Sequence, residues 1–224
     1  MDDTAPDRLL PALLLALTAV TGLVDAVSYL ALGHVFTANM TGNVVFLGFA
    51  IAAAPGLSIP RSGAALLAFI VGALIAGRLV SRTGGGLRRR WTSTGFAIEA
   101  ILLLTAAALA AGAGDLLRDP SRLYGLIVLT GVAMGVRNAV VRRLGERDLT
   151  TTVLTLTITG IAADSTVAGG VNPGWTRRVL SVGLMFAGAA AGAWLLATHS
   201  LAMPLAVSGV ISGSSAIVAR LRDG

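Results

Sequence analysis

The stretch HVFTANMTGNVVFLGFA, residues 34–50, gathers four polar side chains ahead of an apolar run. These side chains are Thr37, Asn39, Thr41 and Asn43. The apolar run, 44–54, ends at Pro55. Eleven helical residues rise only about 16 Å, roughly half the thickness of a bilayer core. The stretch therefore predicts a short helix whose polar N-terminus lies near the middle of a membrane.

The composition around this stretch is that of a membrane protein. Of the 224 residues, 55% are hydrophobic and 12% are charged, and the mean hydropathy is +0.82. Soluble domains carry about 25% charged residues. Apolar segments, several near the length of a membrane span, lie at about 9–33, 36–54, 62–81, 92–114, 122–141, 150–169, 176–197 and 201–219. The sequence predicts an all-α membrane protein with one transmembrane domain, residues 1–224.

The net charge of +6 comes from 17 basic residues, all of them Arg. They lie mostly at the ends of apolar segments and without interleaved aromatic residues, which is typical of membrane topology signals rather than of nucleic-acid binding. The absence of Cys excludes disulfides and thiolate chemistry. The N-terminal MDDTAPDR is acidic, unlike the basic start of a signal peptide, so we expect the first apolar segment to be retained.

An internal repeat appears along the chain. GLVDA (22–26) resembles GVRNA (135–139), and each is followed by a polar stretch, TANMTGN (37–43) or TTVLTLT (151–157). Each half reads as a span, a polar-headed segment and two further spans, an organisation common in transporters. The predicted repeats cover about 8–114 and 121–219.

Counting Arg residues distinguishes two topologies. If all eight apolar segments cross, eight Arg lie on each side of the membrane. If the two polar-headed segments dip in and return, six spans remain, with 13 Arg on the N-terminal side, three on the other, and Arg137 inside a span. The positive-inside rule favours six spans plus two re-entrant or short broken helices, repeats of opposite orientation, and both termini in the cytoplasm. We expect a multi-pass protein of the bacterial cytoplasmic (inner) membrane. Eight full crossings remain the alternative.

Two half-helices that meet at mid-membrane would form a polar site, because helix N-termini offer free N–H groups to anions or carbonyl-bearing solutes. Glycine in the first motif permits close backbone approach. The predicted substrate-binding residues are Asn39, Thr41, Gly42, Asn43, Thr151, Thr155 and Thr157. The alternative is that these side chains only cap helices and join segments.

Charged residues inside spans suggest further roles, because intramembrane charges are costly and are usually paired or functional. Asp25 and Arg137 occupy nearly matching places in the two halves, so we expect an ion pair between them. Glu99 lies about two turns inside a span and His34 adjoins the first motif, and both are predicted proton sites. The alternatives are that Glu99 reaches an Arg-rich loop or another polar group, and that His34 lies at the membrane interface.

Three pairs of Gly residues follow the GxxxG spacing that permits close helix packing. They are Gly131/Gly135, Gly188/Gly192 and Gly209/Gly213. The spacing fits packing within one chain and packing in a homo-oligomer equally well.

The segments GLVDAVSYLALGHVFTANMTGNVVFLG (22–48) and GVAMGVRNAVVRRLG (131–145), with the Thr-rich stretch that follows, resemble the YoaK-type family of bacterial membrane proteins, a domain of unknown function. The resemblance covers nearly the whole chain, and the first motif is its most specific part. In the second motif, Arg137 stands where the family pattern has an amide. The resemblance implies an integral membrane protein and supplies no substrate.

These features predict a small-solute transporter or channel. The alternative is a non-transporting scaffold or accessory subunit. We expect no enzyme activity, because the chain has two His, no Cys, and neither an HExxH nor a GxSxG motif. The expected partners are the lipid bilayer and an unknown small solute, with no nucleic acid, no metal and no cofactor.

Overall fold

The computed structural model describes residues 9–82, 88–145 and 154–221. Its α-helices are α1 (Leu9–Ala31), α2 (Met40–Ile51), α3 (Ile59–Arg82), α4 (Arg88–Ala110), α5 (Pro120–Leu144), α6 (Leu154–Ala163), α7 (Trp175–Thr198) and α8 (Ala202–Leu221). Two short 3-10 helices are η1 (Leu116–Arg118) and η2 (Thr166–Ala168). The described residues contain no strand, which confirms the predicted all-α class.

Local sequence explains where the helices begin and end. The carboxylate of Asp119 accepts a hydrogen bond from the backbone N–H of Arg122, and Pro120 starts α5. Gly145 ends α5 in the left-handed conformation, with φ of 68°. At the C-terminal end of α2, Ala53 adopts a φ of 59°, two residues before Pro55. Caps and turn residues thus fix both ends of α5 and the C-terminal end of α2.

Six helices are long and apolar enough to cross a membrane: α1, α3, α4, α5, α7 and α8. The other two are short, with 12 residues in α2 and 10 in α6. At about 1.5 Å per residue they rise only about 18 Å and 15 Å, well below the roughly 30 Å of hydrocarbon. The helix lengths therefore favour the predicted arrangement of six spans and two short helices over eight full crossings.

The long helices pack mainly across the two halves of the chain. The most extensive interfaces join α3 to α5, α4 to α8 and α1 to α7, and α4 also packs on α5. The short helices instead pack within their own half at equivalent places, α2 on α3 and α6 on α7. Because α2 and α6 make equivalent contacts in the two halves, the packing supports the predicted inverted repeat. The core consists of side chains from both halves, such as Leu17, Phe96 and Met134.

The GxxxG glycines all face helices of the same chain. A Cβ on Gly135 would lie 2.1 Å from the carbonyl oxygen of Phe69 in α3, and one on Gly188 would lie 2.1 Å from that of Ala19 in α1. A Cβ on Gly209 would meet the side chain of Leu104 in α4 at 2.7 Å. Close packing within the chain therefore accounts for the GxxxG spacing, and a homo-oligomer stays a prediction.

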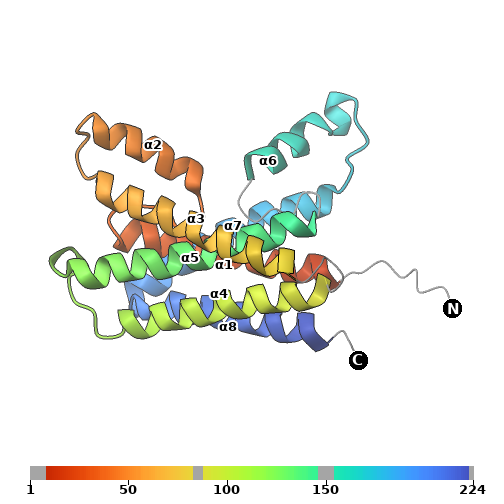
Figure 1. The fold of residues 1–224 in the computed structure, drawn as a ribbon. Coiled ribbons are helices and arrows are strands. Elements are labelled where there is room, and N and C mark those ends of the chain that lie inside the picture. Colours follow the sequence, from red (N-terminus) through yellow and green to blue (C-terminus); the bar gives the residue numbers. More distant parts are fainter. Residues whose placement is uncertain (1–8, 83–87, 146–153, 222–224) are drawn as a thin grey trace.

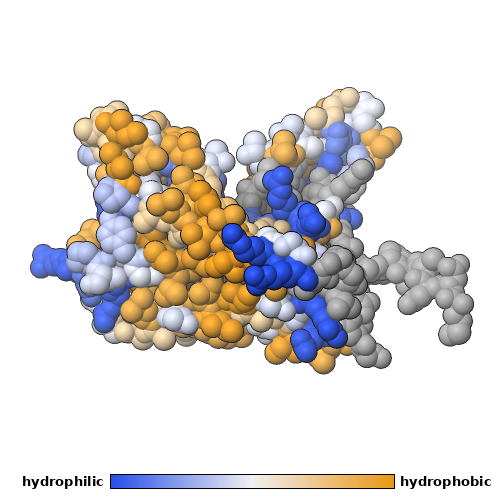
Figure 2. Space-filling view, viewed as in Figure 1, coloured by the Kyte–Doolittle hydropathy of each residue, from blue (hydrophilic) through white to orange (hydrophobic). Residues whose placement is uncertain are grey.

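The short helices are set apart from the long ones (Figure 1). The six long helices lie side by side, whereas α2 and α6 rise from one face of this layer and splay apart like the arms of a V. Their N-terminal ends point toward each other over the middle of the layer. Hydrophobic residues cover the middle of the surface seen in Figure 2, and hydrophilic residues gather toward its two ends. This distribution suits a bilayer that surrounds the long helices.

Candidate functional site

The loop before α2 brings the chain back beside α1. Ala31 ends α1 about 9 Å beyond Asp25. The backbone N–H of Ala38 nevertheless donates a hydrogen bond to the Asp25 carboxylate at 3.1 Å, and the N–H groups of Thr37 and Asn39 also contact that carboxylate. The loop must therefore fold back toward the interior, which places the start of α2 at the depth of Asp25.

The boundary of α2 differs from the expected one. The helix begins at Met40 rather than at Val44, with Asn39 in the N-cap position. Thr41 and Asn43 therefore lie inside the first turn and do not cap the helix. The Asn39 side chain makes no capping hydrogen bond either. Apolar residues at 44–54 suggested the later start, but Thr and Asn are tolerated in a first turn because its N–H groups need no partner within the helix.

Asn43 holds the returning loop in place. Its side-chain oxygen accepts a hydrogen bond from the backbone N–H of Phe36 at 2.9 Å, and its amide group donates to the Phe36 carbonyl. Asn43 is 1% exposed, and a Cβ on the preceding Gly42 would lie 2.7 Å from the Phe36 ring. Asn43 and Gly42 thus hold the loop in place. This is the alternative to substrate binding, in which these residues join segments of the chain.

We expect Asn43→Ala to lower the free energy of unfolding by about 1–3 kcal/mol, because the Phe36 backbone groups lose their partner. Unfolding of the purified protein in mixed micelles, followed by circular dichroism, measures the change. Asn39→Ala is the control, since Asn39 is exposed, and its effect should stay within about 0.5 kcal/mol. Equal effects of the two substitutions would contradict the role given to Asn43.

A cavity of about 510 Å³ lies where the N-terminal ends of α2 and α6 approach each other over α1 and α7. This volume is within the range of small-molecule sites. Its lining combines polar and apolar side chains: Thr21, Asp25, Asn39, Thr41, Gly42, Val45, Phe46, Leu154, Thr155 and Met185. Figure 2 shows the surface hollowed between the two arms. Both halves of the chain thus contribute to one pocket.

The cavity brings together four of the predicted binding residues, namely Asn39, Thr41, Gly42 and Thr155. It does not include Asn43 or Thr157, which are buried elsewhere in the structure. Thr151 lies outside the described residues. Asn39, Thr41 and Thr155 are exposed, so their polar groups are accessible to a molecule in the cavity.

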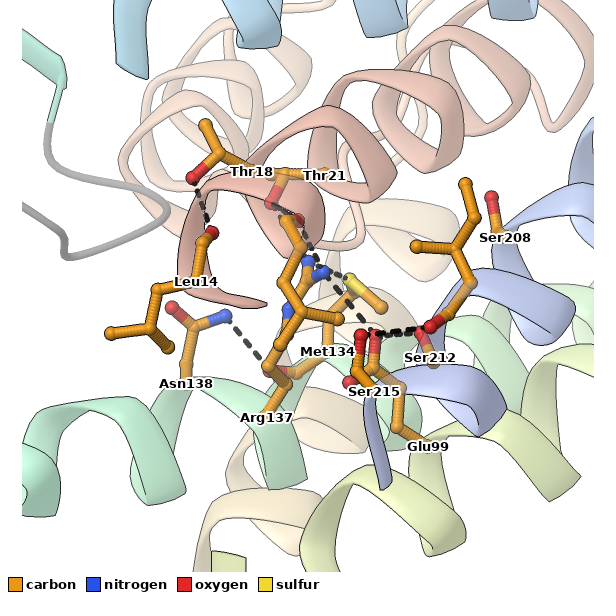
Figure 3. Close-up of polar contacts among 12 residues, drawn as sticks. Leu14, Thr18, Thr21, Glu99, Met134, Arg137, Asn138, Ser208, Ser212 and Ser215 are labelled. Atoms are coloured by element: carbon orange, nitrogen blue, oxygen red, sulfur yellow. Dashed lines mark hydrogen bonds and ion pairs between the residues drawn. The ribbon is translucent and has the colours of Figure 1, made fainter. Parts of the chain in front are cut away.

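Below the cavity, a polar network crosses the centre of the bundle (Figure 3). The guanidinium of Arg137 lies 3.2 Å from the Glu99 carboxylate, and both side chains are fully buried. Ser212 donates a hydrogen bond to the same Glu99 oxygen at 2.9 Å. The ion pair therefore joins α5 to α4, with support from α8.

The expected ion pair between Asp25 and Arg137 is therefore wrong. Arg137 forms its ion pair with Glu99, and it interacts with Asp25 only electrostatically, without a direct contact between the charged groups. The repeat places Asp25 and Arg137 at similar heights, but Asp25 turns its carboxylate to the loop at Ala38. Glu99 thus contacts a polar group of another span, which is one of the alternatives that the sequence analysis gave for it.

Thr21 connects the network to the cavity and was missed by the sequence analysis. Arg137 donates to the Thr21 hydroxyl at 2.9 Å and to the carbonyl of Leu17 at 2.8 Å, and Thr21 also borders the cavity. A signal was present, because Thr21 lies one helical turn before Asp25 and so shares its face of α1. A hydroxyl four residues before an intramembrane Asp is therefore a usable sequence signal for a site residue.

His34 lies away from the cavity. It is exposed, packs edge-to-face on Tyr29 with ring centroids 5.1 Å apart, and adjoins the turn at Gly56. That turn follows the C-terminal end of α2, whereas the cavity surrounds its N-terminal end. The structure therefore does not bring His34, one of the two predicted proton sites, to the cavity. Among the residues described, no three His, Asp or Glu side chains gather in a way that could hold a metal ion.

This arrangement defines the chain as a multi-pass, all-α membrane protein with a cavity of mixed polar and apolar lining between two short helices. It belongs to the family described as protein of unknown function (DUF1275), which it matches over residues 13–218. It is similar to the UPF0700 transmembrane protein YoaK of Bacillus subtilis (strain 168), with 38% identity over 151 residues.

The similarity to YoaK covers 67% of this chain and 64% of the relative. The chain thus matches somewhat less than two thirds of that protein's length. No solved structure matches the chain. These comparisons confirm the YoaK-type resemblance and the membrane-protein class.

Proposed function

We propose that the protein moves a small polar solute across the membrane through the cavity between α2 and α6. The observation that carries this proposal is the lining itself. Polar groups of Asn39, Thr41 and Thr155, which lie at the N-terminal ends of two half-length helices, border one cavity over α1 and α7. Helices that end inside a membrane leave free N–H groups, and transporters use such ends to bind solutes.

The walls favour a neutral or cationic solute over the anion that the helix N-termini first suggested. Asp25 borders the cavity, and whenever this carboxyl group is ionised it repels anions and attracts cations. The same carboxylate already contacts the backbone N–H groups of Thr37, Ala38 and Asn39, which an anion would otherwise use. Apolar neighbours such as Phe46 and Met185 suit a solute with some hydrocarbon surface.

Flux into proteoliposomes tests the proposal. Stopped-flow light scattering follows the entry of glycerol, urea, alanine and methylammonium, and we expect at least one to enter faster than into protein-free vesicles. Thr41→Val and Thr155→Val should each slow that flux about three- to tenfold, because a hydrogen bond to the solute is worth about 0.5–1.5 kcal/mol.

Thr105→Val is the matched control for these variants. Thr105 is exposed on α4, bonds only to its own helix at Ile101, and does not border the cavity. Its flux should equal that of the unmodified protein. A chain that moves no solute of the panel and instead retains a protein partner through purification would favour the scaffold function.

A further inference from the structure

One cation and two carboxylates share the centre of the bundle. Arg137 is fully buried and pairs with Glu99, and it also interacts electrostatically with Asp25. Both carboxyl groups are nearly inaccessible, with Glu99 at 0% and Asp25 at 6% exposed. Of the other acidic residues, those that the structure describes (Asp115, Asp119 and Asp164) lie outside the long helices.

If all three groups are ionised, the cluster has one negative charge in excess. A buried charge without a counter-charge costs several kcal/mol, and such a group usually becomes neutral instead. One guanidinium balances only one carboxylate. The geometry must therefore decide which carboxyl group keeps its charge and which takes up a proton.

Glu99 is placed to remain ionised. It has the direct ion pair with Arg137 at 3.2 Å and accepts the Ser212 hydroxyl at 2.9 Å, and it does not border the cavity. The ionised form of Asp25 is stabilised less, because its hydrogen-bond donors are uncharged backbone N–H groups and its interaction with Arg137 is longer-range. Asp25 also borders the cavity, so a proton can reach it from there.

We propose that Asp25 is the proton-exchanging group of the cavity and holds the proton that neutralises the Asp25–Arg137–Glu99 cluster. The proposal deepens the proposed function, on which it rests, because a proton released by Asp25 would leave a carboxylate facing the solute. Among the described residues, Arg137 of α5 is the charged side chain that acts on Asp25, and Glu99 of α4 acts through Arg137.

Thr21 gives the cavity a second connection to the same cluster. Its hydroxyl accepts a hydrogen bond from Arg137 and donates one to the Leu17 carbonyl at 3.1 Å. A solute in the cavity would thus touch Asp25 directly and Arg137 through one side chain. Binding of a cationic group beside Asp25 would favour release of the Asp25 proton, because the bound cation then balances the carboxylate. Solute binding and proton release would thereby be coupled.

Infrared spectroscopy of the purified protein in nanodiscs tests the proposal without any transport assay. A protonated buried carboxyl group gives a C=O stretching band that ionised groups lack. We expect this band near neutral pH and its loss at alkaline pH. It should shift when the protein carries carboxyl-13C aspartate and stay in place when it carries carboxyl-13C glutamate.

Three variants make the assignment specific. Asp25→Asn should abolish the band, and Asp115→Asn, an exposed control, should leave it unchanged. Glu99→Gln should also remove it near neutral pH, because Arg137 then has one carboxylate left to balance. A band that shifts with labelled glutamate, or no band near neutral pH, would overturn the proposal. Absence of solute flux with the aspartate band present would refute transport while the proton site stands.

Discussion

Replacing Arg137 by Gln should cost about 3–5 kcal/mol of the free energy of unfolding, which is the usual effect of removing one partner of a buried ion pair. The substitution leaves Glu99 as a buried carboxylate without a cation. It also removes the donors to the Leu17 carbonyl and to the Thr21 hydroxyl. Titration of the folded protein with a denaturing detergent, followed by circular dichroism, measures the loss.

Arg142→Gln is the control, because Arg142 belongs to the same helix and is exposed. Its effect should stay within about 0.5 kcal/mol. Glu99→Gln should cost less than Arg137→Gln, since Asp25 then remains as a counter-charge for the guanidinium. The double variant should be more stable than the sum of the single effects predicts. A loss below about 1 kcal/mol for Arg137→Gln would contradict the central place given to this ion pair.

Gly188→Ala should destabilise the protein by about 2–3 kcal/mol, through overpacking at the contact of α7 with α1. The added Cβ would lie 2.1 Å from the carbonyl oxygen of Ala19, which is backbone and cannot rotate away. The helices must therefore separate, which also disturbs the wall that Met185 gives to the cavity. The midpoint of thermal unfolding in detergent measures the effect.

Gly183→Ala in the same helix should have the opposite sign. No atom lies within 4 Å of a Cβ at Gly183, and Ala is favoured over Gly in helices by up to about 1 kcal/mol. We expect this variant to be neutral or slightly more stable. If the two Gly→Ala substitutions shift the midpoint by the same amount, the close approach of α1 and α7 is not what stabilises the fold.

The sequence was sufficient for the fold class and for much of the cavity. Long apolar segments separated by Arg-rich breaks predicted the six spans, and the position of Pro55 predicted a short helix with a polar start. Asn39, Thr41 and Thr155 were found because they lie in the two polar stretches, 37–43 and 151–157, that the internal repeat places before short apolar runs. Each of these signals lies within a few neighbouring residues, where periodicity and turn chemistry act.

The contacts between distant residues could not be predicted in the same way. Arg137 pairs with Glu99 because α4 and α5 pack together, and no local pattern distinguishes that partner from Asp25. Asn43 carries a polar side chain like that of Thr41, yet it lies two positions further along α2 and therefore faces the Phe36 backbone instead of the cavity. The direction of a side chain around its helix decides between binding and structural roles.

The pairing of α1 with α7, α3 with α5 and α4 with α8 also sets an order for biosynthesis. Each pair joins one helix from each half, so the first three spans leave the ribosome before any of their main partners exists. Until those partners are made, the faces that the first three spans bury in the folded protein meet lipid, and Glu99 lacks its ion-pair partner Arg137. Synthesis of α5 supplies Arg137 and a partner for α3 in the same step. Assembly of the protein therefore begins with its fourth span, and the charge balance of the interior is established at that moment.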